Sequence, residues 1–134
     1  MSKTKPKLDA FICWFEIPAD DIKRAQSFYS KLFGWKIKPI PGMADYWHID
    51  TGGPDERPDG GMMVRKHPGQ QITNYIFVPS VNKHLTKIKK LGGEVCLPKT
   101  EVPGMGFFAV CKDPENNTFA IWEMAQKKPA SKKK

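Results

Sequence analysis

The feature that most constrains the fold is a set of chain-breaking residues that occurs twice, in the same order, within 134 residues. Each set comprises a proline after an apolar run, a glycine after a helical pattern, and a Pro-Gly-Met triplet. The pairs are Pro18 with Pro79, Gly34 with Gly92, and Pro41 with Pro103, at separations of 61, 58 and 62 residues. This agreement predicts a duplicated supersecondary unit. A chain of this length forms one ordinary core, so the two copies are expected to share it.

The first copy has the pattern of a βαβββ unit. An apolar run over residues 11–17 ends at Pro18, and Asp20 is the expected cap of a following helix. Apolar residues then recur at helical spacing until Gly34. Extended segments are expected at residues 35–39, 45–51 and 61–66, with an irregular Gly/Pro/Asp-rich loop at 52–60.

The second copy repeats this order. The apolar run is 72–78, Ser80 is the expected cap, the helix ends at Gly92, and strands are expected at 94–98, 106–112 and 118–124. The prediction is one α+β domain over residues 8–126, with modules at 9–66 and 71–126. Its mixed sheet is expected to curve into a cup with the helices outside and a ligand cavity inside. The loop 99–106 and its counterpart 39–44 are interpreted as lids, with plain connectors as the alternative.

The net charge of +8 does not by itself indicate a nucleic-acid binder, because the excess lies at the ends of the chain. Of the 22 basic residues, 8 fall within residues 1–7 and 127–134, leaving 14 to balance the 14 acidic residues. Both ends are expected to be flexible tails. Apolar stretches long enough for a membrane span are absent, and the three cysteines lack metal-type spacing, so a cytoplasmic protein without disulfides is expected.

Several phrases resemble the vicinal oxygen chelate superfamily, which includes glyoxalase I, bleomycin resistance proteins and extradiol dioxygenases. The opening phrase is Trp-Phe-Glu-Ile-Pro-Ala-Asp-Asp at residues 14–21, and Leu-Phe-Gly-Trp follows at 32–35. Near the other end, Asp-Pro-Glu-Asn-Asn at 113–117 precedes the last predicted strand. The resemblance implies paired βαβββ modules around a cup and a homodimer. In the enzymes of the superfamily it also implies a divalent metal held by His and Glu.

The superfamily's metal positions can be placed on this chain by counting from these phrases. They fall near Ile12, Met63, Thr73 and Ala120, none of which is a ligand of the expected type. The resemblance therefore implies that the usual metal site is absent, and no cofactor is expected. A relocated divalent metal is the less favoured alternative.

The candidate pocket is built from aromatic residues on several predicted strands. It comprises Trp14, Trp47, His48, Tyr75, Phe107 and Trp122. Such side chains either converge on a flat or apolar ligand or form an ordinary aromatic core. His48 and Glu123 are catalytic candidates. The alternatives are a structural histidine, and a strand-end carboxylate that is solvated or paired with a lysine.

Two functions follow from this pattern. The first is metal-independent binding of a small organic molecule. The second is a lyase, isomerase or dioxygenase of the same superfamily, with a relocated metal or an acid–base site without metal. The expected partners are a small molecule and a second copy of the chain, with neither nucleic acid nor membrane. The sequence does not identify the ligand.

Overall fold

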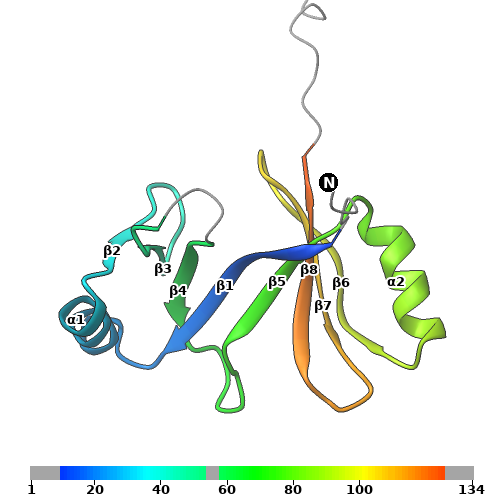
Figure 1. The fold of residues 1–134 in the computed structure, drawn as a ribbon, viewed down its shortest axis with the longest axis horizontal. Helices are drawn as coiled ribbons and strands as arrows, with labels where there is room; N and C mark the ends of the chain where they lie inside the picture. The colour runs from blue at the N-terminus through cyan, green and yellow to red at the C-terminus, as the bar shows by residue number, and fades with distance from the viewer. Residues whose placement is uncertain (1–9, 54–57, 126–134) are drawn as a thin grey trace, which may run out of the picture. The chain divides into compact units, whose positions relative to one another are not determined.

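The computed structural model describes residues 10–53 and 58–125, and its elements follow the order βαβββ twice (Figure 1). This order and the coexistence of parallel and antiparallel strand pairs confirm the α+β class. The predicted lysine-rich tails lie outside the described residues. The elements are β1 (Phe11–Ala19), α1 (Ile22–Phe33), β2 (Lys36–Pro39), β3 (Tyr46–Asp50), β4 (Gly60–Val64), β5 (Thr73–Phe77), α2 (Val81–Lys90), β6 (Glu94–Val102), β7 (Gly106–Lys112) and β8 (Thr118–Met124).

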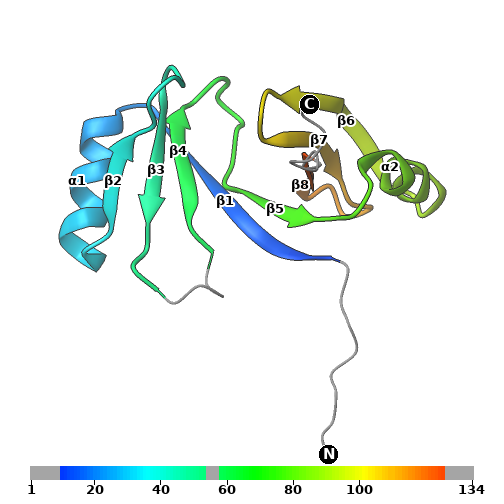
Figure 2. The same ribbon diagram turned by 90° about the horizontal axis from the view of Figure 1, so that it is seen from above.

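Contacts divide the chain into two compact units. Of the described residues, the N-terminal unit contains Ile12–Ile76, and the C-terminal unit contains residues 77–125 together with residues 10 and 11. In the N-terminal unit, neighbouring strands follow the order β2-β3-β4-β1-β5 (Figure 2). Strand β5 is the first strand of the second βαβββ repeat in the sequence, but most of it belongs to the N-terminal unit. Strand β1 runs parallel to β4, whereas β2-β3 and β3-β4 are antiparallel.

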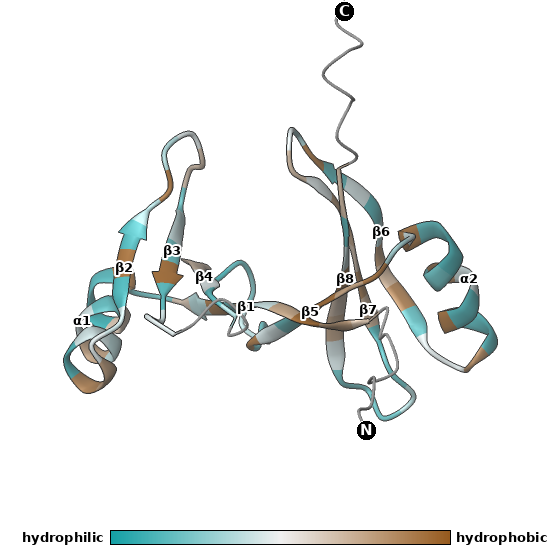
Figure 3. Ribbon diagram, turned by 45° about the horizontal axis from the view of Figure 1, so that its top comes forward, coloured by the Kyte–Doolittle hydropathy of each residue, from teal (hydrophilic) through white to brown (hydrophobic). Residues whose placement is uncertain are grey.

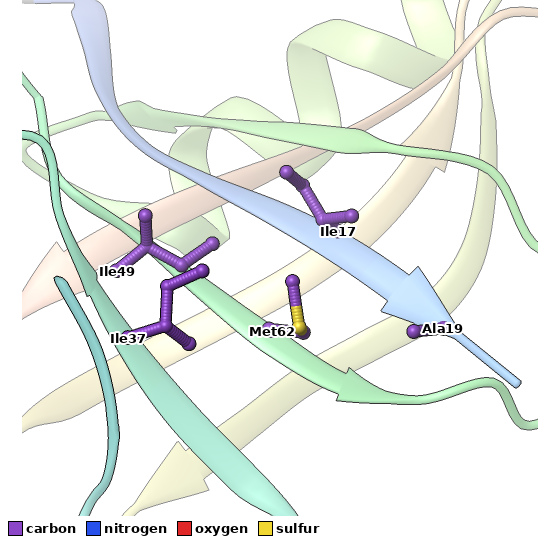
Figure 4. Close-up of a cluster of buried hydrophobic side chains, with 5 residues drawn as sticks. All are labelled: Ile17, Ala19, Ile37, Ile49 and Met62. Atoms are coloured by element: carbon purple, nitrogen blue, oxygen red, sulfur yellow. The ribbon is translucent and has the colours of Figure 1, made fainter. Parts of the chain in front are cut away.

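The core of the N-terminal unit lies between its sheet and α1. Five buried side chains from β1, β2, β3 and β4 form it: Ile17, Ala19, Ile37, Ile49 and Met62 (Figure 4). Ile22, Ala25 and Tyr29 of α1 pack against this cluster. Strand β2 has one hydrophobic residue between polar neighbours, the alternation of a strand with one buried face (Figure 3).

Helix α1 begins one residue later than the sequence indicated. The parallel ladder with β4 continues through Pro18 to Ala19, which pairs with Val64, so the strand does not end at the proline. The prediction of Asp20 as cap is therefore wrong. Asp21 caps the helix instead, its side chain accepting a hydrogen bond from the Arg24 backbone N–H at 3.0 Å. The predicted stop at Gly34 is confirmed, since its φ of 77° is in the left-handed region that favours glycine.

The C-terminal unit contains the antiparallel strand order β8-β7-β6 and helix α2. Ser80 caps α2 as predicted, accepting from the Lys83 backbone N–H at 3.2 Å. Fully buried side chains of this unit include Val78, Val81, Ala109, Cys111 and Ala120. Among the two ranges that the structure covers, no helix is long and apolar enough to cross a membrane.

Residues 99–102 belong to a strand, so the prediction of a loop over 99–106 is wrong. Strand β6 runs to Val102, and a tight turn closed by the Met105 N–H donating to the Val102 carbonyl leads directly into β7. Register shifts on either side of Leu97 accommodate this edge strand, which tolerates Pro98 because an edge strand need not donate on its outer side. Gly104 and Gly42 both have φ near 80°, at 77° and 83°, so the two Pro-Gly-Met turns share a backbone conformation.

Candidate functional site

The candidate site lies on the face of the N-terminal unit's sheet opposite the core. Successive side chains of a strand point to opposite faces, so Phe15 and Ile17 face the core cluster while Trp14 and Glu16 face the other way. Tyr46 and His48 alternate in the same manner with Trp47 and Ile49, which face the core. We call this second face, with Trp14, Glu16, Tyr46, His48 and Tyr75, the aromatic–carboxylate face.

A chain of hydrogen bonds joins four of these side chains across three strands. The Trp14 indole N–H donates to the Tyr46 hydroxyl at 2.9 Å, and the Tyr46 hydroxyl donates to Glu16 Oε2 at 2.8 Å. The Tyr75 hydroxyl donates to the other carboxylate oxygen of Glu16, Oε1, at 3.0 Å. The residues are far apart in sequence, so only the fold brings them together. Both phenols hold the Glu16 carboxylate in one position.

Burial raises the pKa of Glu16 above its ordinary value, because the charged form loses hydration. The hydrogen bonds from Tyr46 and Tyr75 and the more distant charge of Lys66 oppose this effect. Burial also raises the pKa of both tyrosines, and the negative charge of Glu16 raises it further. The phenols therefore stay protonated as donors, and Glu16 is the group of this network whose protonation changes at lower pH than theirs.

Gly61 provides the space that the network requires. It stands between Glu16 of β1 and His48 of β3 in the two strand ladders. A Cβ at this position would overlap the hydroxyl end of the Tyr46 ring. Tyr46 reaches from β3 across β4 to Glu16 only because residue 61 has no side chain. Gly60 is similarly close to the Phe15 ring on the core side.

His48 borders the network on one side. Its imidazole stacks on the Trp14 indole, with ring centroids 5.9 Å apart and an interplanar angle of 23°. Its Nε2 lies 3.2 Å from Asp59 Oδ2, and Asp59 Oδ1 accepts from the Thr51 backbone N–H at 3.1 Å. Asp59 is thereby fixed by the loop after β3, and it holds the imidazole against the indole.

Comparison with known proteins identifies the family. The profile described as bleomycin resistance protein-like N-terminal matches residues 12–52, the segment that contains Trp14, Glu16 and Tyr46. A glyoxylase-like domain-containing protein of Didymella fabae is 35% identical over 119 residues, covering 82% of this chain and 91% of the relative. The chain belongs to the glyoxalase/bleomycin resistance/dioxygenase superfamily.

Other relatives of the superfamily are longer. The anthracycline biosynthesis protein DnrV of Streptomyces peucetius is 30% identical, and the alignment covers 81% of this chain but 45% of DnrV. The chain thus spans about half the length of that relative. A solved superfamily structure from Vibrio splendidus 12B01 superposes with a TM-score of 0.63 over 87% of this chain and 99% of that one, at 13% identity. This likeness supports the fold alone.

The four positions that the resemblance assigned to the superfamily's metal ligands lie in different surroundings in the structure. Strand alternation places Ile12 and Met63 on the aromatic–carboxylate face and Thr73 on the same face as Tyr75, whereas Ala120 is buried in the C-terminal unit. None of the four side chains offers the imidazole or carboxylate that a divalent ion of this type binds. Within residues 10–53 and 58–125, no group of three or more His, Cys, Asp or Glu side chains is arranged to hold a metal ion.

The structure places the six predicted pocket residues in three surroundings. Trp14, His48 and Tyr75 belong to the aromatic–carboxylate face. Trp47 packs against the core cluster on the other side of the sheet, which corresponds to the alternative of an ordinary aromatic core. Phe107 and Trp122 lie in the C-terminal unit, where the Lys99 ammonium sits 4.4 Å from the Phe107 ring centroid and the Trp122 indole N–H contacts the Met124 sulfur.

Glu123, one of the two catalytic candidates, has a structural contact. Its Oε1 accepts a hydrogen bond from the Val81 backbone N–H at 2.9 Å, at the start of α2. A carboxylate there satisfies one of the unpaired amides of the helix N-terminus and complements its dipole. This contact anchors β8 to α2 within the C-terminal unit. The sequence predicted a solvated or lysine-paired carboxylate as the alternative to a catalytic one, and it did not indicate this contact with the helix.

Sequence reasoning missed Glu16 and Tyr46 as site residues. Glu16 belongs to the phrase that resembles the superfamily, and it is also the one charged residue in the apolar run 11–17, which is a signal for a site residue. An acidic residue two positions from Trp14 in a strand must share its face. Tyr46 gave no comparable signal, because its contact with Glu16 depends on the glycine in β4.

A groove elsewhere in the N-terminal unit is a weaker candidate than this face. It is a groove of about 540 Å³ lined by Asp20, Arg65, Lys66, His67 and Pro68. Its guanidinium is already engaged, since Arg65 binds Asp20 at 2.9 Å and donates to the Gln70 and Pro18 carbonyls. Few guanidinium N–H donors of Arg65 therefore remain to bind an anion in a fixed geometry.

Proposed function

We propose that this chain binds a small organic molecule on the aromatic–carboxylate face, without a metal ion at the superfamily's usual position. The observation that carries the proposal is the hydrogen-bonded chain Trp14–Tyr46–Glu16–Tyr75. It places fixed polar groups among large aromatic rings on the sheet face that the core does not use. A few oriented polar groups within aromatic walls are typical of small-molecule sites.

The partial burial of these side chains favours binding over a purely structural role. Trp14, Glu16, Tyr46, His48 and Tyr75 are each neither fully buried nor fully exposed, so each retains surface for contact. A carboxylate in a packed core would be expected to be fully enclosed and paired. Names among the relatives that refer to anthracycline biosynthesis support a flat polycyclic ligand class for the proposal.

A thermal-shift screen of flat organic metabolites against the full chain tests the proposal. A ligand of the native state raises the unfolding temperature by mass action. The expected result is a stabilising compound whose effect is lost in Trp14→Ala and Tyr75→Phe. The matched control is Phe28→Ala, an exposed aromatic on α1 whose loss should leave binding intact. Stabilisation that survives in both site variants would contradict the proposed location.

Elemental analysis of protein purified without chelator tests the metal-independent part. We expect less than about one tenth of an equivalent of any divalent transition metal, because Ile12, Met63 and Ala120 provide no imidazole or carboxylate for a cation that must shed its water. Near-stoichiometric metal that is lost in Glu16→Ala or His48→Ala would instead favour the relocated-metal enzyme. A cytoplasmic homodimer remains part of the proposal, and light scattering over micromolar concentrations would measure the mass.

A second candidate function is proton transfer at a carbon atom of the bound molecule. The raised pKa of Glu16 favours it, because a carboxylate poised closer to neutral pH can accept a proton and return it. In this case the ligand screened above would exchange a C–H for deuterium in heavy water. The exchange would require Glu16, and Glu16→Gln would abolish it. Binding without exchange would restrict the function to the first candidate.

A further inference from the structure

We propose that the ligand of the aromatic–carboxylate face is an organic ammonium ion, whose positive charge lies between the Glu16 carboxylate and the surrounding aromatic rings. This inference rests on the proposed function and specifies the chemical class of its ligand. It concerns the N-terminal unit alone, since all the side chains that carry it belong to residues 12–76.

The first argument is the unbalanced charge of Glu16. The ion pairs of the described residues are His48–Asp59 and Arg65–Asp20, and Glu16 belongs to neither. Lys66 influences it only as a more distant charge. Its hydrogen bonds come from neutral phenols, which orient a carboxylate but do not neutralise it. A partly desolvated carboxylate without a cation is costly, and a positively charged ligand would relieve that cost.

The second argument is the binding capacity that remains on the carboxylate. Two carboxylate oxygens together offer about four lone-pair directions. The Tyr46 and Tyr75 hydroxyls occupy one on each oxygen, at 2.8 and 3.0 Å. An ammonium group carries hydrogen-bond donors only, so it can donate to the remaining lone pairs of the Glu16 carboxylate. An anionic ligand would meet repulsion from Glu16 and from Asp59 nearby on the same side.

The third argument is the aromatic surroundings. Indole and phenol rings attract cations through their electron-rich faces, and Trp is the strongest of them. The Tyr46 and Tyr75 hydroxyls contact the Glu16 carboxylate directly, and the Trp14 indole N–H contacts the Tyr46 hydroxyl, so all three aromatic residues belong to the network around the carboxylate. The indole N–H of Trp14 and both phenol protons are directed within this network, so the donors of the network are already engaged. A ligand that approaches Glu16 must therefore supply its own donors, which an ammonium group does.

The test uses three soluble probes of the same shape and different charge: 2-naphthylmethylamine, 2-naphthalenemethanol and 2-naphthoate. Binding to the full chain is measured by ligand-observed NMR at pH 7.5, where the amine is protonated. We expect the amine to bind about tenfold more tightly than the alcohol, in keeping with one hydrogen bond to a charged group. The naphthoate is expected to bind more weakly than either.

Glu16→Gln is expected to remove the preference for the amine while leaving binding of the alcohol within about twofold. Glu94→Gln, an exposed glutamate at the start of β6, changes net charge equally and is expected to keep the preference. The wild type provides a second test. The preference should fall as pH is lowered and Glu16 becomes protonated. The charged and titratable groups around Glu16 that must be considered in this titration are His48, Asp59, Lys66, Tyr46 and Tyr75.

Equal affinity of the amine and the alcohol for the wild type would overturn the cation proposal while leaving the proposed function in place. A preference that persists in Glu16→Gln, or that does not weaken at low pH, would also overturn it. Failure of all three naphthalene probes to bind, together with failure of the metabolite screen, would overturn both proposals.

Discussion

Replacing Gly61 with alanine should dismantle the hydrogen-bonded network without touching any of its members. The new Cβ would overlap the hydroxyl end of Tyr46. Gly61 is held by pairing to Glu16 on one side and His48 on the other, so the backbone has little freedom to move away. Tyr46 must therefore swing out and give up its bonds with Trp14 and Glu16.

The cost can be worked from these two bonds. The bond to the carboxylate contributes about 1.5–3 kcal/mol and the one from the indole about 1 kcal/mol. Alanine offsets about 0.5–1 kcal/mol of this, because it restricts the unfolded chain more than glycine does. We expect Gly61→Ala to lower the free energy of unfolding by about 1.5–3.5 kcal/mol and to weaken ligand binding.

Urea denaturation followed by tryptophan fluorescence measures this change. Gly69→Ala is the matched control, because a Cβ there meets only the His67 ring at an ordinary 3.8 Å. In a Tyr46→Ala background the obstruction is gone, so adding Gly61→Ala should cost little more. A Gly61→Ala protein within about 0.5 kcal/mol of wild type, with ligand binding intact, would refute the reasoning.

Two further predictions concern the carboxylates of Glu16 and Glu123. The raised pKa means that Glu16 binds its proton more tightly in the folded protein than in the unfolded chain. Its contribution to stability is therefore fully present below its pKa in the unfolded chain. The contribution is lost as pH rises through its pKa in the folded protein. Denaturation from pH 4.5 to 8 should show this loss in wild type and a flatter profile in Glu16→Gln; identical profiles would contradict it. Glu123→Ala removes the acceptor for the Val81 N–H and should cost about 1 kcal/mol, measured by thermal unfolding, with unchanged binding on the N-terminal unit. A loss of ligand binding in that variant would return Glu123 to the functional candidates.

The fold was predictable because it depends on local signals. Gly34, Gly42 and Gly104 need a backbone conformation that few other residues adopt, and each marks a turn or helix end that the sequence alone located. Ser80 and the apolar spacing of α1 act within a few residues in the same way. Errors arose where pairing with another strand overrides a local rule, as for Pro18 in β1.

The site was less predictable because it depends on contacts between distant residues. Glu16 meets a phenol 30 residues away and another 59 residues away. The first of these contacts depends on a glycine in a third strand, which a list of chemically active residue types does not include. Trp14 and Tyr75 were identified from residue type and strand position, whereas Trp47 has the same residue type but faces the core.

The most direct test of binding at the aromatic–carboxylate face is the NMR signal of the Trp14 indole N–H. The chain has four tryptophans, and Trp14→Phe assigns this signal by its disappearance. We predict that a stabilising ligand from the thermal-shift screen shifts the Trp14 indole signal. The indole N–H donates to the Tyr46 hydroxyl, which in turn donates to Glu16, the proposed contact of the ligand. Unchanged Trp14 resonance at saturating ligand would contradict the account and place the binding site elsewhere.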